Sequence, residues 1–279
     1  MNTVASHERT LENALSDQLR VAMIGYGAIG QSIARRLTGE LDGKVELSHV
    51  LVRNLRSDGC DHNLTTSLND LINSEPDLVI ECAGHEALHQ YGSVILGSGT
   101  DLMIISSGAL TDASLEQKLL SSARDSGAHI EIPAGAIGGV DAICAARRAG
   151  LSSIQHTSIK PTRAWMGTPA EQQTNLNALR EKFVVFDGTA REAATMYPEN
   201  ANVSATISFA GLGLDRTHVR LVADPDALVT THIIEAEGEF GSLRQITTSS
   251  ALDGNPKSSS FTAYSAVNSI LRRLETIRI

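Results

Sequence analysis

The chain has 279 residues, a net charge of −9 at pH 7 and 42% hydrophobic residues, which suits a globular protein of one or two domains. The acidic balance argues against non-specific binding to nucleic acid or to an anionic membrane. No apolar run approaches the roughly 18 residues of a membrane span, and three cysteines without metal-ligand spacing predict no metal site and fit a reducing cytosol. We therefore expect a cytoplasmic protein whose ligands are small molecules.

Residues 1–18 are polar and acidic, so they predict a flexible N-terminal extension rather than a targeting peptide. Beyond them, predicted strands and helices alternate as far as residue 150. The strands are expected at 20–25, 45–52, 77–82, 101–106 and 129–132, and the helices at 28–37, 67–73, 86–96 and 112–125. Several of these strands are apolar on both faces, as when helices cover both sides of a parallel sheet. The pattern predicts a doubly wound, Rossmann-type α/β domain over residues 19–150.

The second half of the chain has a different pattern. Strands are expected at 153–160, 203–210, 217–223, 232–236 and 243–248, and a turn into a short helix at 184–194. With few helices between the strands, this half predicts a second α+β domain over residues 151–257, built on an open mixed or antiparallel sheet. The tail contains an amphipathic segment, and we expect a helix within 258–279 to return and pack on the first domain.

The first predicted strand ends in the pattern Gly25-x-Gly27-x-x-Gly30, which leads directly into a predicted helix. Gly25 permits a tight turn, Gly27 lets the backbone approach a pyrophosphate, and Gly30 lets helix and strand pack closely. Ala28 and Ile29 lie in the first helical turn, where free N–H groups face the phosphates. The motif predicts a dinucleotide site, although a plain strand–turn–helix of another α/β protein has the same local pattern.

The end of the second strand bears on which dinucleotide is bound. An acidic residue there favours NAD, but this chain has Arg53, which can pair with a 2′-phosphate. We therefore expect NAD or NADP as the cofactor, with NADP accepted. A solvent-facing arginine is the alternative interpretation, and Asp58 or Asp61 could still serve the ribose.

His232 is the histidine whose position points most clearly to chemistry. The two-residue period of a strand places it on one face with Ile234 and Ala236, and places Glu235 and Glu237 on the other. A histidine on the apolar face of a sheet is either a satisfied core group or a proton carrier near neutral pH. The remaining histidines, including the strand residues His156 and His218, are interpreted as structural, with His218 on a solvent face.

Two further segments have unusual compositions. Residues 131–139 contain mostly small side chains before a helix, which suggests either a backbone close to a ligand or a tight helix entry. Asn200 and Asn202 precede a predicted strand, where their amides either form turns or bind a nicotinamide carboxamide.

Taken in order, these segments resemble the L-aspartate dehydrogenase family. The matching pieces are 25–30, 132–139, 197–203, 211–217, 231–241 and 255–259. The resemblance makes His232 the active-site histidine and assigns Ala136 and Asn202 to the dinucleotide. The family often has an asparagine before this histidine, whereas this chain has Thr231, which removes one possible means of orienting the ring.

The resemblance implies reversible NAD(P)-dependent oxidative deamination of L-aspartate to iminoaspartate, which gives oxaloacetate and ammonia or feeds NAD biosynthesis. It also implies a homodimer. The two substrate carboxylates require cations or helix N-termini, and we select Lys160 and Arg163 as the cations. A solvated loop is the alternative interpretation of their segment. The alternatives are another two-domain reductase, such as a homoserine or dihydrodipicolinate enzyme, and a non-catalytic redox sensor that binds the dinucleotide.

Overall fold

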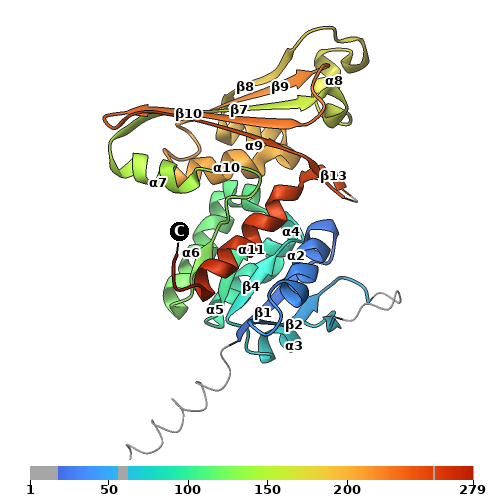
Figure 1. The fold of residues 1–279 in the computed structure, drawn as a ribbon, viewed down its shortest axis with the longest axis vertical. Helices are drawn as coiled ribbons and strands as arrows, with labels where there is room; N and C mark the ends of the chain where they lie inside the picture. The colour runs from blue at the N-terminus through green and yellow to red at the C-terminus, as the bar shows by residue number, and fades with distance from the viewer. Residues whose placement is uncertain (1–17, 56–61, 254, 279) are drawn as a thin grey trace, which may run out of the picture.

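The protein is described here by a computed structural model that covers residues 18–55, 62–253 and 255–278. Asp58, Asp61 and nearly all of the predicted N-terminal extension therefore lie outside the described residues. Two sheets with their helices follow one another along the long axis of the molecule, as Figure 1 shows. The fold class expected from the sequence, a Rossmann-type parallel sheet followed by a second sheet, is confirmed.

The first sheet has six strands in the order β3-β2-β1-β4-β5-β6, and all its pairs are parallel. The strands are β1 (Leu19–Ile24), β2 (Val45–Leu51), β3 (Leu64–Thr65), β4 (Leu78–Glu81), β5 (Asp101–Ile104) and β6 (Ile130–Glu131). Because β1 and β4 are neighbours while the chain runs to β2 and β3 between them, the strand order reverses at this point. Ligands of such sheets bind at the carboxyl ends of the strands beside the reversal.

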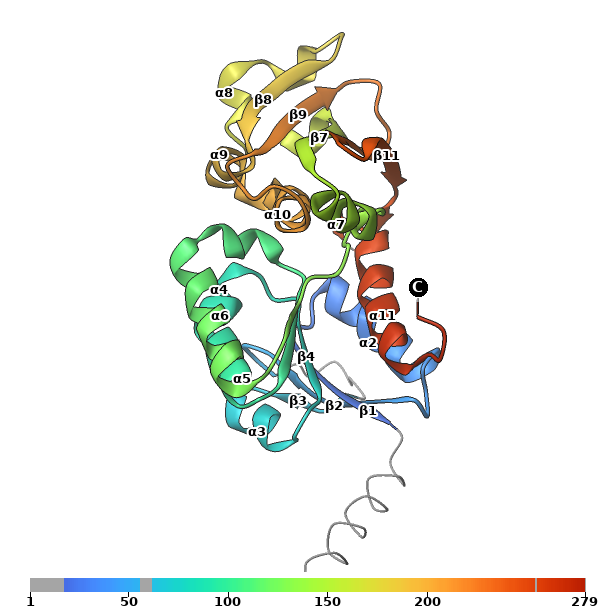
Figure 2. The same ribbon diagram turned by 90° about the vertical axis from the view of Figure 1, so that its left-hand side faces the viewer.

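Helices cover both faces of the first sheet (Figure 2). They are α2 (Ala28–Gly39), α3 (Leu68–Asn73), α4 (His85–Ala87), the π-helical turn η2 (Leu88–Gly92), α5 (Ser93–Gly97), the 3₁₀ turn η3 (Ser107–Thr111), α6 (Ala113–Ser126) and α11 (Ser260–Leu274). Side chains alternate along each strand, so Val21 and Met23 pack under α2 and α11 while Ala22 and Ile24 pack under α3, α5 and α6. The strands are apolar on both faces because each face of the sheet belongs to its own hydrophobic core.

The second sheet has the order β11-β10-β7-β9-β8, and every pair is antiparallel except β7 with β9. Its strands are β7 (Leu151–Pro161), β8 (Phe183–Thr189), β9 (Thr217–Asp224), β10 (Thr230–Gly238) and β11 (Gly241–Ser249). Around it lie α7 (Val140–Arg148), η4 (Thr162–Trp165), α8 (Ala170–Gln173), η5 (Leu176–Ala178), α9 (Ala190–Met196), η6 (Pro198–Asn200) and α10 (Ala201–Ala210), followed by the small pair β12 (Ala251–Leu252) and β13 (Asn255–Ser259). Helices α7, α9 and α10 cover the face turned toward the first sheet (Figures 1 and 2).

The strand expected at 203–210 is wrong, because these residues form most of α10. Most of them are buried, including the hydroxyl residues Ser204, Thr206 and Ser208, since the helix is packed between the second sheet, α7, α9 and η3. A helix buried on every side lacks the polar stripe that gives a helical period. The segment 184–194 is also divided differently: β8 continues to Thr189, whose hydroxyl and Glu192 then form the capping box that begins α9.

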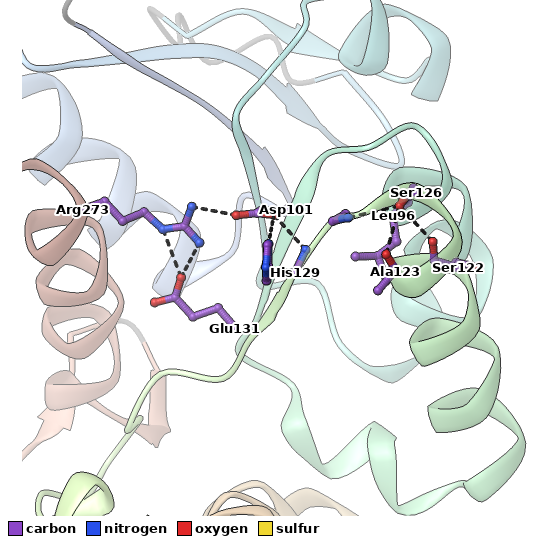
Figure 3. Close-up of polar contacts among 9 residues, drawn as sticks. Leu96, Asp101, Ser122, Ala123, Ser126, His129, Glu131 and Arg273 are labelled. Carbon is purple, nitrogen blue, oxygen red and sulfur yellow. Dashed lines mark hydrogen bonds and ion pairs between the residues drawn. The ribbon is translucent and has the colours of Figure 1, made fainter.

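The C-terminal helix α11 packs against α2, and Figure 3 shows how its last turn is held to the first sheet. The Arg273 guanidinium donates to Asp101 Oδ2 at 2.8 Å and to Glu131 Oε2 at 2.7 Å. These contacts join α11 to the starting end of β5 and to β6. Burial opposes ionisation of Asp101, but the hydrogen bonds from Arg273 and His129 outweigh it and lower the pKa of this carboxyl. Among the described residues, every helix is too short or too polar to span a bilayer.

Candidate functional site

A cavity of about 480 Å³ lies where the two sheets face each other. Residues of the first half line it near the glycine loop and the segment 133–136, and residues of the second half line it from the ends of β7 and β10. Six of the residues selected from the sequence meet in it: Ile29, Ala136, Lys160, Arg163, Asn202 and His232. The cavity also has many hydroxyl groups, contributed by Ser107, Thr206, Thr230, Ser249, Ser250, Ser258, Ser259 and Thr262.

The glycine loop after β1 has the geometry that a pyrophosphate site requires. Gly25 has φ of +93°, and a Cβ there would lie 2.9 Å from Ala83 Cα. A Cβ on Gly30 would lie 2.5 Å from the Gly25 carbonyl oxygen, so α2 approaches β1 as closely as it does only because this residue is glycine. Gly27 differs, since nothing lies within 4 Å of its added Cβ and no side chain caps α2. The N-terminus of α2, which includes Ala28, is thus open to an anionic ligand.

Glu81, at the end of β4, organises the loops beside the strand-order reversal. Its buried carboxylate accepts hydrogen bonds from the N–H groups of Ala83 and Gly84, both at 2.7 Å, and from the N–H and hydroxyl of Ser106, both at 3.1 Å. Burial raises the pKa of Glu81 against the lowering effect of these donors. The sequence analysis missed this residue; the available signal was a single acid closing an otherwise apolar strand.

His232 is buried beside a second histidine. Its ring is 5% exposed, and its Nδ1 lies 3.0 Å from Nε2 of His156, which is itself 1% exposed. Nδ1 of His156 lies 3.0 Å from the hydroxyl of Ser204 on α10. As expected from the two-residue period, Ile234 and Ala236 are buried on the same face of β10 as His232. The interpretation of His156 as an ordinary strand residue misses this contact.

Both imidazoles are kept neutral by their surroundings. Burial, reinforced by the positive charge of Lys160, lowers the pKa of His156 to about 3. Burial, then the proximity of His156 and Lys160, lowers the pKa of His232 well below its ordinary value. Because Nδ1 of His232 is engaged by His156, Nε2 is the nitrogen that can act on a ligand in the cavity. A neutral ring with that nitrogen unprotonated is a proton acceptor.

Lys160 and Arg163 bring positive charge to the same cavity. The Lys160 ammonium donates to the side-chain oxygen of Asn200 and lies 5.6 Å from the centre of the Trp165 ring. Arg163 donates to the carbonyl oxygen of Leu228 at 3.3 Å. These contacts direct two cationic groups to one wall of the cavity, where a dicarboxylate could meet them.

Asn202 joins the two halves of the molecule as well as lining the cavity. Its side-chain oxygen accepts the N–H of Gly108 at 2.9 Å, and its carbonyl oxygen accepts the hydroxyl of Ser107 at 2.9 Å. Asn202 therefore stands at the start of α10 rather than before a strand, with its amide near the end of β5. Ala136 lines the same cavity and is 9% exposed.

Arg53, Thr231 and His218, which the sequence analysis also discussed, do not line the cavity. Arg53 follows β2 with an 81% exposed side chain, 3.6 Å from Glu86. The hydroxyl of Thr231 lies 3.4 Å from that of Thr248, on the strand face opposite His232, so Thr231 makes no contact that orients the ring. His218 lies on a solvent face, as expected, where it pairs with Asp187 at 2.8 Å.

Known proteins resemble this chain over nearly its whole length. Residues 141–273 match the family described as aspartate dehydrogenase, C-terminal, and residues 25–133 match the NAD-binding domain of homoserine dehydrogenase. An L-aspartate dehydrogenase of Cupriavidus necator is 42% identical over 94% of this chain and 100% of its own length, and one of Pseudomonas aeruginosa is 42% identical over the same shares. The chain belongs to the L-aspartate dehydrogenase family. The crystal structure of an aspartate dehydrogenase from Thermotoga maritima, 25% identical, superimposes with a TM-score of 0.75 and covers 94% of this chain and 99% of that one.

The first half of this L-aspartate dehydrogenase family member matches a domain that is described from a different enzyme, homoserine dehydrogenase. An archaeal homoserine dehydrogenase described in complex with NADPH has a TM-score of 0.55 at 11% identity, which reflects a shared fold alone. The first half therefore matches an NAD-binding domain described from homoserine dehydrogenase, whereas the half that contains His232 matches the aspartate dehydrogenase C-terminal family.

Proposed function

We propose that this protein is an NAD(P)-dependent L-aspartate dehydrogenase, which oxidises L-aspartate to iminoaspartate. The observation that carries the proposal is the cavity itself. It places the N-terminus of α2, the cations Lys160 and Arg163, and the buried imidazole of His232 around one space. A dinucleotide, a dicarboxylate and a proton acceptor are the three components of this reaction.

The dinucleotide would be held by the first half of the chain, residues 19–150. Its pyrophosphate fits the open N-terminus of α2 at Gly27, where an added Cβ would meet no neighbour. Ala136 and Asn202 line the cavity farther along and would contact the nicotinamide end. When bound, the nicotinamide supplies the acceptor for the substrate hydride. Arg53 at the end of β2 would meet a 2′-phosphate, so NADP is accepted as well as NAD.

His232 would act as the proton acceptor. An N–H bond of the substrate ammonium breaks, and its proton passes to Nε2 of the ring, so that the nitrogen lone pair can form the imine as the Cα hydride departs. After the ring has released that proton to solvent, the same nitrogen can take a proton from the water that attacks the imine carbon. The carbon–nitrogen bond then breaks, which gives oxaloacetate and ammonia. The low pKa of His232 keeps the ring unprotonated before the reaction at neutral pH.

The second half, residues 151–257, would select the substrate. Lys160 and Arg163 would pair with its two carboxylates, which distinguishes a dicarboxylic amino acid from a neutral one. This half also leaves the outer face of its sheet without a helix, and Ile246 there is 54% exposed beside the ion pair of Glu235 with Arg244. We propose that a second copy covers this face in a homodimer, which light scattering would detect as twice the chain mass.

The assay that tests the function is the reduced-nicotinamide absorbance with a panel of amino acids and both nucleotides. L-Aspartate should give the highest kcat/KM, ahead of L-glutamate, L-homoserine and L-malate. A preference for L-homoserine would favour the related two-domain reductases. Nucleotide binding with no turnover on any of these substrates would favour a redox sensor.

A further inference from the structure

His156 is a buried titratable residue that the proposed reaction does not yet use. It lies on β7, and the register pairs it with Ile234 while Ser158 pairs with His232. The two imidazoles are therefore diagonal neighbours on the covered face of the sheet, with ring centroids 5.2 Å apart. On the other side of His156, the hydroxyl of Ser204 from α10 lies within hydrogen-bond distance of Nδ1. Three segments distant in sequence thus place three polar groups in a row that ends at the cavity.

Proton counting limits this row to two arrangements. Each neutral imidazole carries one N–H, and the contact between the rings needs one donor and one acceptor. In one arrangement His232 donates from Nδ1 to His156 Nε2, and His156 donates from Nδ1 to the Ser204 oxygen. In the other, Ser204 donates to His156, which donates to His232, and the remaining N–H of His232 then lies on Nε2. Only the first leaves Nε2 of His232 as a base.

We infer that Ser204 and His156 are positioning residues that hold His232 in the Nδ1–H form, with the Nε2 lone pair turned toward the substrate ammonium. The inference rests on the proposed function, because it is the reaction that requires a base. Other contacts agree with it. Thr231 bonds across the opposite strand face and cannot orient the ring. Lys160, four residues along β7, is the charged neighbour of both rings and disfavours a cation on either.

The kinetic test compares His156→Leu, His156→Gln and Ser204→Ala. Leucine fills the space without an acceptor, so kcat with L-aspartate should fall on the order of 10- to 100-fold, a part of what a general base contributes. Glutamine offers an acceptor oxygen at about the reach of the imidazole Nε2, so it should recover most of that loss. KM and nucleotide affinity should stay within about twofold, since His156 does not line the cavity. His129→Gln, at an exposed histidine on the far end of the first sheet, is the matched control and should behave like the unaltered protein.

A second readout does not depend on activity. Two-dimensional ¹⁵N–¹H spectra of the histidine rings report which nitrogen carries the proton. In the unaltered protein His232 should appear neutral with its proton on Nδ1, and His156→Leu should shift it toward the Nε2–H form. This measurement stands even if L-aspartate proves not to be the substrate, so failure of the proposed function and failure of this inference are distinguishable.

Two outcomes would overturn the inference. An equal fall of kcat in the leucine and glutamine variants would assign His156 a packing role. An Nε2–H or doubly protonated His232 in the unaltered protein would show that the row runs in the other direction. A selective rescue by glutamine together with the Nδ1–H spectrum supports it.

Discussion

In the first half of the molecule the buried carboxylate of Glu81 meets four hydrogen bonds, whereas in the second half the buried imidazoles of His156 and His232 meet each other and one hydroxyl. The donors to this carboxylate come from the segments that follow β4 and β5, so its hydrogen bonds hold these two loops in place. Three of the four ring nitrogens have a hydrogen-bond partner within the row, and the fourth, Nε2 of His232, is the one that can reach the cavity. A buried polar group whose atoms all have hydrogen-bond partners stabilises the fold, whereas a buried group with one unpartnered atom facing a cavity is available to react with a ligand.

The largest effect is expected from His232→Ala, which tests whether the imidazole pair of the second half takes part in the reaction. If the outward-facing nitrogen is the base, kcat should fall on the order of 10²–10⁴-fold. Nucleotide affinity, measured by fluorescence titration, should persist because the glycine loop is untouched. Near-normal turnover by a folded variant would remove His232 from the mechanism and leave the second half with no proton acceptor from this pair.

Lys160→Met tests whether the same wall of the cavity binds a carboxylate. A hydrogen bond to a charged group contributes about 1.5–3 kcal/mol, so KM for L-aspartate should rise on the order of 10- to 100-fold. Lys182→Met, at a mostly exposed lysine paired with Asp224 at 3.4 Å, is the matched control. Equal KM values for the two variants would show that Lys160 does not meet the substrate.

The histidine pair should also make stability depend on pH. In the folded protein the pKa of His156 is lowered to about 3 and that of His232 lies well below 6.5, so the unfolded chain binds more protons between these values and about 6.5. Stability should therefore be full above pH 6.5 and decline as the pH falls below it, by about 1.4 kcal/mol per pH unit for each ring. Urea unfolding at pH 7.0 and 5.5 measures this, and His156→Gln should remove roughly half of the pair's contribution. An unchanged dependence in that variant would contradict the assignment.

The smallest expected effect belongs to the first half. Arg53 is mostly exposed and pairs only weakly with Glu86, so its contact with a 2′-phosphate would be screened by solvent. Arg53→Ala should raise KM for NADP by about three- to tenfold and leave KM for NAD unchanged. Parallel rises with both nucleotides would instead indicate damage to the loop after β2.

The sequence predicts the two halves unequally well, and the reason is the range of the interactions. The glycine loop is a local feature: turn, close approach and helix start follow one another within six residues, and the structure has each of them. The β10 face of His232 also follows from a local period. The pairing of His156 with His232 does not, because it depends on the register between β7 and β10, 76 residues apart. The two-residue period of β7 puts His156 on the same face as Ile154, but only the folded sheet brings it to another ring.

Burial explains the other difference. The segment 203–210 alternates apolar residues with the hydroxyl residues Ser204, Thr206 and Ser208, and this two-residue period favours a strand. It nevertheless forms α10, because nearly all its sides are covered by protein. Glu81 escaped notice for a related reason, since a lone acid at the end of an apolar strand usually marks a strand end in solvent. The partners that bury α10, and the Ser106 donors to Glu81, lie elsewhere in the chain.

The return of α11 to the first sheet has a consequence for how the molecule is made. Its apolar side chains Ala263, Val267 and Ile270 complete the core over β1 and α2, and Arg273 fastens β5 and β6. The first half is synthesised before α11, so one face of its sheet stays uncovered until α11 has emerged from the ribosome. Assembly of the nucleotide-binding half would then be postponed until α11 is available, and a chain stopped before α11 would expose this apolar face to chaperones and proteases.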